Sequence, residues 1–254
     1  MSYSATSRVA LITGATSGIG VVIARQLLDA GFHVVVSGRS VQRGEAVVAE
    51  LGSDRAAFVS ADLVKTGAAA ELISNATETF GRLDVLVNNA AIDHTGDLLG
   101  VGEEEIRAVF ETNTFAAMNL LIAAARVMRD QGDGGSIINI TSRLASIGVP
   151  TMGIYSASKG AMLAFTRAAA IDLAPYDIRV NAVAPGMTRT PLYQEWLDGL
   201  PDPEAEARRV AEAIPLGRIA EPADVAAVVR FLASPEASYL TGISVPVEGG
   251  YLAK

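Results

Sequence analysis

VALITGATSGIG, at residues 9–20, is an apolar run of strand length that passes directly into a glycine-rich turn. Regularly spaced apolar residues follow it, so the segment predicts a buried strand, a tight turn and the start of a helix. Strand, turn and helix in this order form the first unit of an alternating α/β fold.

The glycines of this turn fit a phosphate-binding role. Glycine permits a tight turn and close approach of the backbone to a pyrophosphate, which also meets the positively polarised end of the following helix. The spacing is G-x-x-x-G-x-G rather than the commoner G-x-G-x-x-G, and a purely structural turn is the alternative. The position between strand and helix favours nucleotide binding, with contacts from Gly14, Ser17, Gly18, Ile19 and Gly20.

Apolar runs of strand length recur along the chain between periodic runs of helix length. The predicted strands are residues 9–13, 33–37, 56–60, 85–88, 136–140, 179–184 and 244–247. The predicted helices are residues 19–30, 44–51, 67–80, 103–129, 153–173 and 222–233. The strands are continuously apolar, as expected when helices cover both faces of a parallel sheet. The sequence therefore predicts one α/β domain over residues 1–254, a doubly wound Rossmann-type fold with a seven-stranded parallel sheet.

Composition narrows the expected partners and location. Half of the 254 residues are hydrophobic and the formal net charge is −8, which disfavours nucleic acid and anionic membrane surfaces as partners. The absence of cysteine excludes disulfides, thiolate metal sites and a cysteine nucleophile, and no metal site is predicted. Residues 1–7 show no secretory signal, and no run of about 18 apolar residues predicts a membrane span. We therefore expect a cytoplasmic protein.

The end of the second predicted strand bears on cofactor choice. NAD-preferring sites tend to carry a carboxylate there, which binds the ribose hydroxyls. This chain has Ser37-Gly38-Arg39-Ser40 instead, so no acid repels a 2′-phosphate and Arg39 can bind one with a charge-assisted hydrogen bond. A solvated surface arginine is the alternative. The sequence favours NADP(H) as the cofactor, with NAD(H) as the alternative.

Tyr155 and Lys159 stand four residues apart in a predicted helix, so their side chains share one face. A free tyrosine has a pKa of about 10 and is a poor acid or base at neutral pH. A neighbouring cation favours the phenolate and lowers that pKa, which suits Tyr155 to general acid–base work. A surface pair without function is the alternative, because the spacing alone is weakly specific.

With these motifs in view, the chain resembles the short-chain dehydrogenase/reductase family from about residue 8 to residue 250. The motifs stand in the family's order: the glycine motif, Asn88-Asn89-Ala90, the pair Tyr155 and Lys159, and Pro185-Gly186. Ser142 lies thirteen residues before Tyr155, which is the family's usual separation. The joint pattern is far more specific than any one of its parts.

The resemblance implies an oxidoreductase with a catalytic set of four residues. Tyr155 would be the general acid–base group, and Lys159 would lower its pKa and hold the nicotinamide ribose. Ser142 would hydrogen-bond the substrate oxygen, and Asn113 would hold a water that links Lys159 to solvent. The cofactor would carry the hydride, while the protein supplies orientation, a proton and electrostatic stabilisation. Ser142 as a strand-end cap and Asn113 as an ordinary helix residue are the alternatives.

Further cofactor contacts follow from the resemblance. Asp62 and Leu63 would lie at the adenine, Asn89 and Ala90 beside the ribose, and Pro185, Gly186, Thr188 and Thr190 near the nicotinamide amide and a phosphate. Asn88 is expected to be structural and to tie neighbouring strands together through backbone bonds. The family's usual Asn-Asn-Ala-Gly is Asn-Asn-Ala-Ala here, which adds a methyl group at Ala91.

The substrate would lie between residues 91–97, residues 143–153 and a lid over about residues 187–214. The candidate pocket residues are Ile92, His94, Arg143, Leu144, Ile147, Met187, Leu192 and Trp196. Leu192 and Trp196 lie four apart on an expected short helix, so they either close over the cofactor or pack this helix down. Arg143 could anchor a carboxylate, although a solvated arginine is the commoner case. His94 could hydrogen-bond a substrate hydroxyl.

These observations predict reversible hydride transfer between NADP(H) and a small-molecule ketone or secondary alcohol, as in a carbonyl reductase. A 3-oxoacyl-thioester reductase is an alternative, disfavoured because residues 130–133 and 174–177 are neutral or acidic rather than basic. A non-catalytic dinucleotide-sensing protein is another, although this chain keeps both Tyr155 and Lys159. An enoyl reductase is disfavoured because those relatives use a wider tyrosine–lysine spacing. The resemblance also implies a homotetramer, or a homodimer, packed through residues 103–129 and 153–173.

Overall fold

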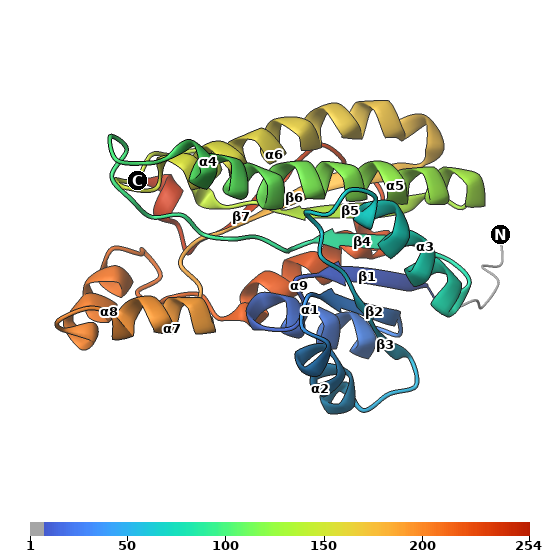
Figure 1. The fold of residues 1–254 in the computed structure, drawn as a ribbon, viewed down its shortest axis with the longest axis horizontal. Helices are drawn as coiled ribbons and strands as arrows, with labels where there is room; N and C mark the ends of the chain where they lie inside the picture. The colour runs from blue at the N-terminus through green and yellow to red at the C-terminus, as the bar shows by residue number, and fades with distance from the viewer. Residues whose placement is uncertain (1–7) are drawn as a thin grey trace.

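A computed structural model describes residues 8–254, which form a seven-stranded parallel sheet in the order β3-β2-β1-β4-β5-β6-β7 (Figure 1). The strands are β1 (Val9–Thr13), β2 (His33–Gly38), β3 (Ala56–Ser60), β4 (Val85–Asn88), β5 (Gly135–Ile140), β6 (Ile178–Pro185) and β7 (Ser244–Val247). The expectation of a leader-free start at residues 1–7 lies outside the described residues. The predicted α/β fold is confirmed, and every predicted strand is found within one residue of its predicted ends.

Helices cover both faces of the sheet, with α1, α2 and α9 on one side and α3, α4, α5 and α6 on the other (Figure 1). The helices are α1 (Gly18–Asp29), α2 (Val41–Leu51), α3 (Ala68–Phe80), α4 (Glu103–Phe110), α5 (Ala116–Gln131), α6 (Gly153–Leu173), α7 (Pro191–Asp198), α8 (Pro203–Glu212) and α9 (Pro222–Ala233). Alternate residues of β1 supply the two cores: Ala10 and Ile12 pack with α1 and α9, whereas Val9 and Leu11 pack with α3 and α5.

The strand order reverses next to β1, because β1 pairs with β2 on one side and with β4 on the other. At such a point the connections that leave the two neighbouring strands run to opposite faces of the sheet, and a crevice remains at the carboxyl ends of the strands. Thr13, Asn88, Ile140 and Pro185 all end strands at this edge. The fold therefore gathers the predicted site residues at the end of the sheet where ligands bind in open α/β proteins.

The predicted helix over residues 103–129 is a longer helical run with an irregular centre. A π-helical turn at Glu111–Phe115 joins α4 to α5, and the run continues to Gln131. Within residues 8–254, Glu103–Gln131 is the one run long and apolar enough to cross a membrane by length and composition, and half of its apolar window is buried inside the fold. Leu120, Leu121 and Met128 bury this run against the sheet, as the core helix of a globular domain requires.

Residues 185–215 form two helices rather than a largely irregular stretch with one short helix. Each helix begins with a polar cap followed by proline: Thr190 accepts from the backbone N–H of Tyr193, and Asp202 accepts from the backbone N–H of Ala205. This pairing of cap and proline is a helix-start signal that the sequence carried. Helices α7 and α8 project from the main body in Figure 1 and share a small apolar cluster of Tyr193, Leu197, Ile214 and Ile219.

Candidate active site

The glycine-rich turn between β1 and α1 is packed so closely that side chains cannot be accommodated. Gly14 has φ of 62°, and a Cβ there would lie 2.7 Å from the Cα of Ala90. A Cβ on Gly20 would lie 2.7 Å from both the Cα of Ala15 and the amide nitrogen of Asn89. Positive φ and such close approaches both require glycine. The turn is therefore locked against the end of β4.

The first turn of α1 offers backbone N–H groups to a ligand. Its N-cap residue, Ser17, is extended, and its side chain accepts no capping hydrogen bond. The first N–H groups of a helix have no partner within the helix, and together with the helix dipole they favour an anion. Gly18, with φ of 58°, lies beside Thr190: a Cβ there would be 3.6 Å from its methyl group. The start of α7 therefore lies against the glycine turn.

Asn89 braces this turn from β4. Its side-chain amide donates to the carbonyls of Thr13 (2.9 Å) and Gly14 (3.1 Å). The hydroxyl of Thr13 accepts from the backbone N–H of Asn89 and donates to the carbonyl of Val87. Any contact of Asn89 with a ribose would therefore have to come from atoms other than these amide hydrogens.

Asn88 has a structural role, but not the expected bonds between neighbouring strand backbones. Its amide donates to the side chain of Asn139 in β5 (2.9 Å) and to the carbonyl of Ala117 in α5 (3.2 Å). Asn139 in turn donates to the hydroxyl of Thr166 in α6. A buried chain of side chains thus ties two strands to two helices beneath the crevice.

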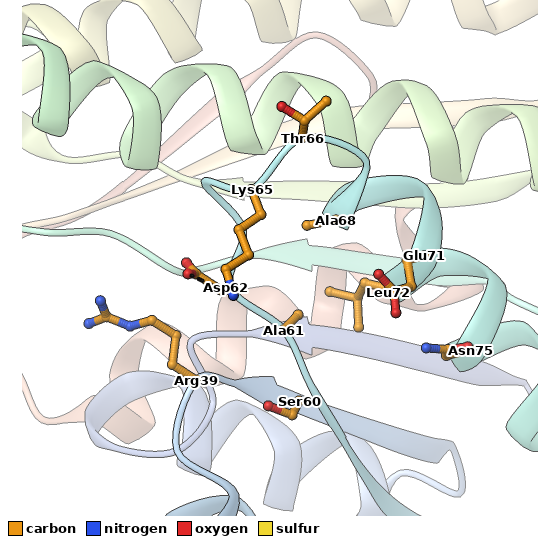
Figure 2. A pocket seen from close by; sticks show the side chains of 10 residues that line it. All are labelled: Arg39, Ser60, Ala61, Asp62, Lys65, Thr66, Ala68, Glu71, Leu72 and Asn75. Carbon is orange, nitrogen blue, oxygen red and sulfur yellow. Dashed lines mark ion pairs between the residues drawn. The ribbon is translucent and has the colours of Figure 1, made fainter.

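A cavity of about 490 Å³ lies at the ends of β2 and β3 (Figure 2). Arg39, Ser60, Asp62 and Lys65 line it, and Lys65 pairs with Asp62 at 3.8 Å. The guanidinium of Arg39 makes no hydrogen bond or ion pair with any residue in 8–254, and the nearby hydroxyl of Ser37 is buried without a partner. Leu63 instead packs against the core. Arg39, which has no partner among the described residues, fits a phosphate-bearing nucleotide, and Lys65, which is paired with Asp62, was not predicted from the sequence.

Helix α6 brings Tyr155 and Lys159 together at the end of β5. Lys159 is buried, and its ammonium donates to the carbonyl of Ile140 (2.9 Å) and lies 5.7 Å from the centre of the Tyr155 ring. Ser142 follows the same strand and interacts with Tyr155 closely enough to oppose the rise of the phenol's pKa. The hydroxyl of Ser142 accepts from the backbone N–H of Leu144, so Ser142 caps the short helical turn Arg143–Ala145.

Tyr155 titrates in the direction opposite to the sequence prediction. Its pKa is raised to about 12, chiefly by burial and also by the Asp93 carboxylate, while the hydrogen bond with Ser142 opposes the rise. Burial lowers the pKa of Lys159 to about 8 against a smaller opposing effect of Asp93. The sequence analysis expected Lys159 to lower the pKa of Tyr155, but in this structure burial and the Asp93 carboxylate raise it, because desolvation disfavours the phenolate.

Asn113 lies at the centre of a closed hydrogen-bond chain. Its Oδ1 accepts from the backbone N–H of Ile92 (2.8 Å), and its Nδ2 donates to the carbonyl of Ile92 (2.9 Å) and to the hydroxyl of Ser158 (3.2 Å). Ser158 donates to the carbonyl of Tyr155 (2.7 Å). The π-helical turn carries Asn113, and such turns are frequent at functional sites. The side-chain amide is thus used up in positioning Ile92 and Ser158.

Asp93 is a site residue that the sequence predictions missed. It follows Ile92 directly, and its carboxylate accepts from the backbone N–H of His94 (2.8 Å). Its charge raises the pKa of both Tyr155 and Lys159. The imidazole Nδ1 of His94 is buried without a hydrogen-bond partner within residues 8–254.

Helix α7, which lies in the expected lid, is not packed onto the protein through Leu192 and Trp196. Tyr193 and Leu197 are its buried residues, whereas Leu192 and Trp196 are 56% and 38% exposed. Met187 packs against the same lid cluster as Tyr193 and Leu197. The packing alternative for Leu192 and Trp196 is therefore wrong, and both remain available to a ligand.

The segment between β6 and α7 is fixed by backbone contacts. The backbone N–H of Gly186 donates to the carbonyl of Val247, and a Cβ on Gly186 would lie 2.8 Å from the Cβ of Glu248. The buried Thr188 donates to the carbonyl of Gly186 (3.1 Å). Pro185 ends β6, so Pro185, Gly186, Thr188 and Thr190 run from the sheet edge to the glycine turn.

The last helical turn, Tyr251–Ala253, reaches Arg143, a contact that no local sequence pattern indicates. The guanidinium of Arg143 stacks 4.0 Å from the centre of the Tyr251 ring, and the ammonium of Lys254 lies 4.8 Å from the same ring. Arg143 is half-buried, and burial lowers its pKa against opposing effects of Tyr251 and Glu248. The expectation of a solvated arginine is wrong.

No group of three metal-ligating side chains exists within the described part of the chain. What the structure assembles is a tightly packed glycine-rich turn, a cavity lined by Arg39 and Lys65, and the constellation of Ser142, Tyr155 and Lys159. The side chains supply a proton donor, oxygen-stabilising donors and a buried cation at one end of the sheet. This combination is suited to proton transfer beside a bound dinucleotide.

Known proteins agree with this geometry. A family model described as "Enoyl-(Acyl carrier protein) reductase" matches residues 14–252. The chain is 35% identical to the NADP-dependent (R)-specific alcohol dehydrogenase of Lentilactobacillus kefiri, over 97% of each chain. It is 37% identical to the diacetyl reductase [(S)-acetoin forming] of Staphylococcus epidermidis, over 96% of this chain and 98% of the relative.

Among solved structures, a variant of actinorhodin polyketide ketoreductase with NADPH superposes with a TM-score of 0.91 at 34% identity, covering 96% of this chain and 97% of that one. Another, described as a short chain dehydrogenase/reductase family protein, superposes with a TM-score of 0.87 at 38% identity, covering 98% of this chain and 100% of that one. Fold, motif order and similarity along almost the whole chain agree, and the chain belongs to the short-chain dehydrogenase/reductase family.

Proposed function

We propose that this oxidoreductase transfers a hydride reversibly between NADP(H) and a carbonyl or secondary alcohol. The observation that carries the proposal is the constellation at the end of β5, where Ser142 interacts with Tyr155 and the buried Lys159 lies 5.7 Å from the Tyr155 ring. The constellation stands at the same sheet edge as the glycine turn. A dinucleotide on that turn would extend toward these side chains.

Tyr155 is the proton donor in the direction of reduction. With a pKa of about 12 it is protonated at neutral pH and can donate to a substrate oxygen. Ser142 donates its hydroxyl hydrogen to that oxygen, and so stabilises the charge that develops there. The cofactor, when bound, supplies or accepts the hydride. Oxidation of an alcohol runs the same steps backward and needs the phenolate.

Lys159 holds the ribose and provides a cation near Tyr155. Its ammonium already donates to the carbonyl of Ile140, which fixes its position, and two further donor hydrogens remain. Its pKa of about 8 also makes it a competent proton carrier. Because the amide of Asn113 is fully engaged, a water linking Lys159 to solvent would be held by the backbone carbonyls of the π-helical turn.

NADP(H) is the preferred cofactor, with NAD(H) as the alternative. Arg39, which lacks an internal partner, is the proposed ligand of the 2′-phosphate, and Lys65 adds a second positive charge to the same cavity. The names of the Lentilactobacillus dehydrogenase and of the actinorhodin ketoreductase structure mention NADP or NADPH, which supports this choice. Asp62, Ala90 and Thr188 keep their proposed places at the adenine, the ribose and the nicotinamide.

The proposed substrate is a small ketone or secondary alcohol beneath a lid at residues 187–214. Relatives named as an alcohol dehydrogenase and a diacetyl reductase support this class. A 3-oxoacyl-thioester reductase remains the second candidate within the family. We also propose a homotetramer or homodimer, because α5 and α6 leave an apolar hollow of about 290 Å³, and Phe115 and Ile122 are exposed on the same helical run. The proposed location is the cytoplasm.

The test is a screen of ketones with NADPH and NADH, and of secondary alcohols with NADP⁺ and NAD⁺. We expect turnover with the phosphorylated cofactor and tight binding measured by energy transfer from Trp196. Cofactor binding without turnover in a wide screen would favour the dinucleotide-sensing alternative. Failure to bind either cofactor would overturn the proposal itself.

A further inference from the structure

Arg143 stands directly beside the proposed oxyanion-stabilising residue, Ser142, on the short helical turn after β5. Burying a guanidinium normally requires a carboxylate or several carbonyl acceptors to replace water. Arg143 is half-buried, yet its guanidinium makes no hydrogen bond or ion pair with any other residue in 8–254. Its nitrogens are therefore available to a ligand.

Stacking on Tyr251 holds the guanidinium in one orientation. The two groups are 4.0 Å apart, and a planar guanidinium on an aromatic face keeps its edge N–H groups free for bidentate binding. The ammonium of Lys254 lies on the same ring and donates to the carbonyl of Ala213. Tyr251 thus has the Arg143 guanidinium and the Lys254 ammonium on one ring, in a protein whose net charge is −8.

Glu248, the acid that acts on Arg143, limits the negative charge of a ligand that could bind to the Arg143 guanidinium. Glu248 raises the pKa of Arg143 through its charge, and its carboxylate is occupied in accepting from the backbone N–H of Leu252 (3.0 Å). The single negative charge of Glu248 does not cancel the two positive charges of Arg143 and Lys254, so the local charge stays positive. The same carboxylate would repel a dianion more strongly than a monoanion. A monoanionic ligand is favoured over a phosphate for this reason.

We infer that Arg143, seated on Tyr251, selects substrates that carry a carboxylate near the reacting carbon, so that the enzyme reduces a short oxo acid or oxidises the corresponding hydroxy acid. The inference rests on the proposed hydride transfer and names the substrate class. Ser142 and Tyr155 hold the reacting oxygen, and Arg143, one residue further along, binds the carboxylate. Arg143 is thus a specificity-determining residue, and Tyr251 is a positioning residue that acts through it.

Matched substrate pairs test this inference: 2-oxo, 3-oxo and 4-oxo acids against their methyl esters, and a phosphorylated ketone, all with NADPH. For wild type we expect kcat/KM for the best oxo acid to exceed that of its ester by about 10- to 100-fold, the worth of a charged hydrogen-bonded pair. Arg143→Gln should remove most of this ratio, mainly through KM. Arg143→Lys should restore part of it, and Tyr251→Leu should give an intermediate loss. Arg208→Gln, which changes an exposed arginine of α8, is the matched control and should keep the wild-type ratio.

Two results would overturn the inference while leaving the proposed function standing: esters turned over as well as acids, or an unchanged ratio in Arg143→Gln. Preference for the phosphorylated ketone would also contradict it. If no substrate is turned over, the proposed function fails. The carboxylate site is then tested separately by calorimetric titration of wild type and of Arg143→Gln with the oxo acids. Binding of the oxo acids to wild type but not to Arg143→Gln would then support the carboxylate site, and equal or absent binding would contradict it.

Discussion

The floor and the rim of the crevice differ in how their polar groups are satisfied. In the floor, comprising Asn113, Ser142, Tyr155, Ser158 and Lys159, every side chain except that of Tyr155 makes a hydrogen bond within the protein, and Tyr155 lies beside Ser142 and Lys159. In the rim, comprising Arg39, Arg143 and α7, two cations lack a hydrogen-bonding partner within residues 8–254, and Leu192 and Trp196 lie exposed. The difference teaches that the proposed catalytic side chains are held in position by the protein itself. The side chains proposed to select the ligand have no such partners and would bind the ligand directly.

The largest expected effect separates a floor tyrosine from a rim tyrosine. Tyr155→Phe should lower kcat by about 10³-fold or more, because Tyr155 is the proposed acid that protonates the substrate oxygen, while cofactor affinity stays within about twofold. Tyr193→Phe is the matched control, because the hydroxyl of Tyr193 has no hydrogen-bond partner in the described structure. Steady-state kinetics and a cofactor titration measure both. Equal losses in both variants would break the distinction between floor and rim.

Next in size is the effect of the unpaired cation at the adenosine end. Arg39→Ser should weaken NADPH binding by about 10- to 100-fold, the worth of charge-assisted hydrogen bonds to a phosphate, and leave NADH binding unchanged. Fluorescence titration of both cofactors gives the numbers. Arg230→Ser, an exposed arginine on α9, serves as the control. Parallel losses for the two cofactors would show that Arg39 does not read the 2′-phosphate.

The buried charge of Lys159 should lower the free energy of unfolding at neutral pH. Its pKa is lowered from 10.5 to about 8 in the folded protein, so the unfolded chain binds this proton more tightly. The cost is therefore present below about pH 8 and disappears as pH rises toward 10.5. Between pH 7 and pH 9.5 the unfolding free energy of wild type should rise by about 2 kcal/mol relative to Lys159→Met.

Urea unfolding at the two pH values measures this difference. Lys65→Met, which changes a lysine whose side chain is 76% exposed, is the control and should follow wild type. An identical pH dependence in Lys159→Met and wild type would mean that Lys159 is not desolvated in the fold.

The smallest expected effect lies where floor and rim meet. Asp93 raises the pKa of Tyr155, so Asp93→Asn should move the alkaline pKa of alcohol oxidation to lower pH. Asp97→Asn, in the same segment, is the control. A profile that does not move, or that moves to higher pH, would remove Asp93 from the electrostatics of the site.

The sequence predicts the sheet and the floor far better than the rim. Continuous apolar runs locate all seven strands, the spacing of four residues singles out Tyr155 and Lys159, and the family resemblance adds Ser142. The raised pKa of Tyr155 escapes prediction because desolvation depends on packing from several elements. Lys65 and Tyr251 escape it because only the folded chain brings Lys65 into one cavity with Arg39 and Tyr251 onto Arg143. Helices α7 and α8 were predictable from their Thr-Pro and Asp-Pro starts.

The central claim, that the floor transfers a hydride from NADPH to a carbonyl, is tested most directly with (4S)-deuterated NADPH. The family resemblance implies that the 4-pro-S hydride is the one transferred. We expect mass spectrometry to find deuterium on the carbinol carbon of the alcohol product with wild type and no labelled product with Tyr155→Phe. Bound NADPH that keeps its deuterium with every ketone tested, or labelled product formed equally well by Tyr155→Phe, would contradict the account.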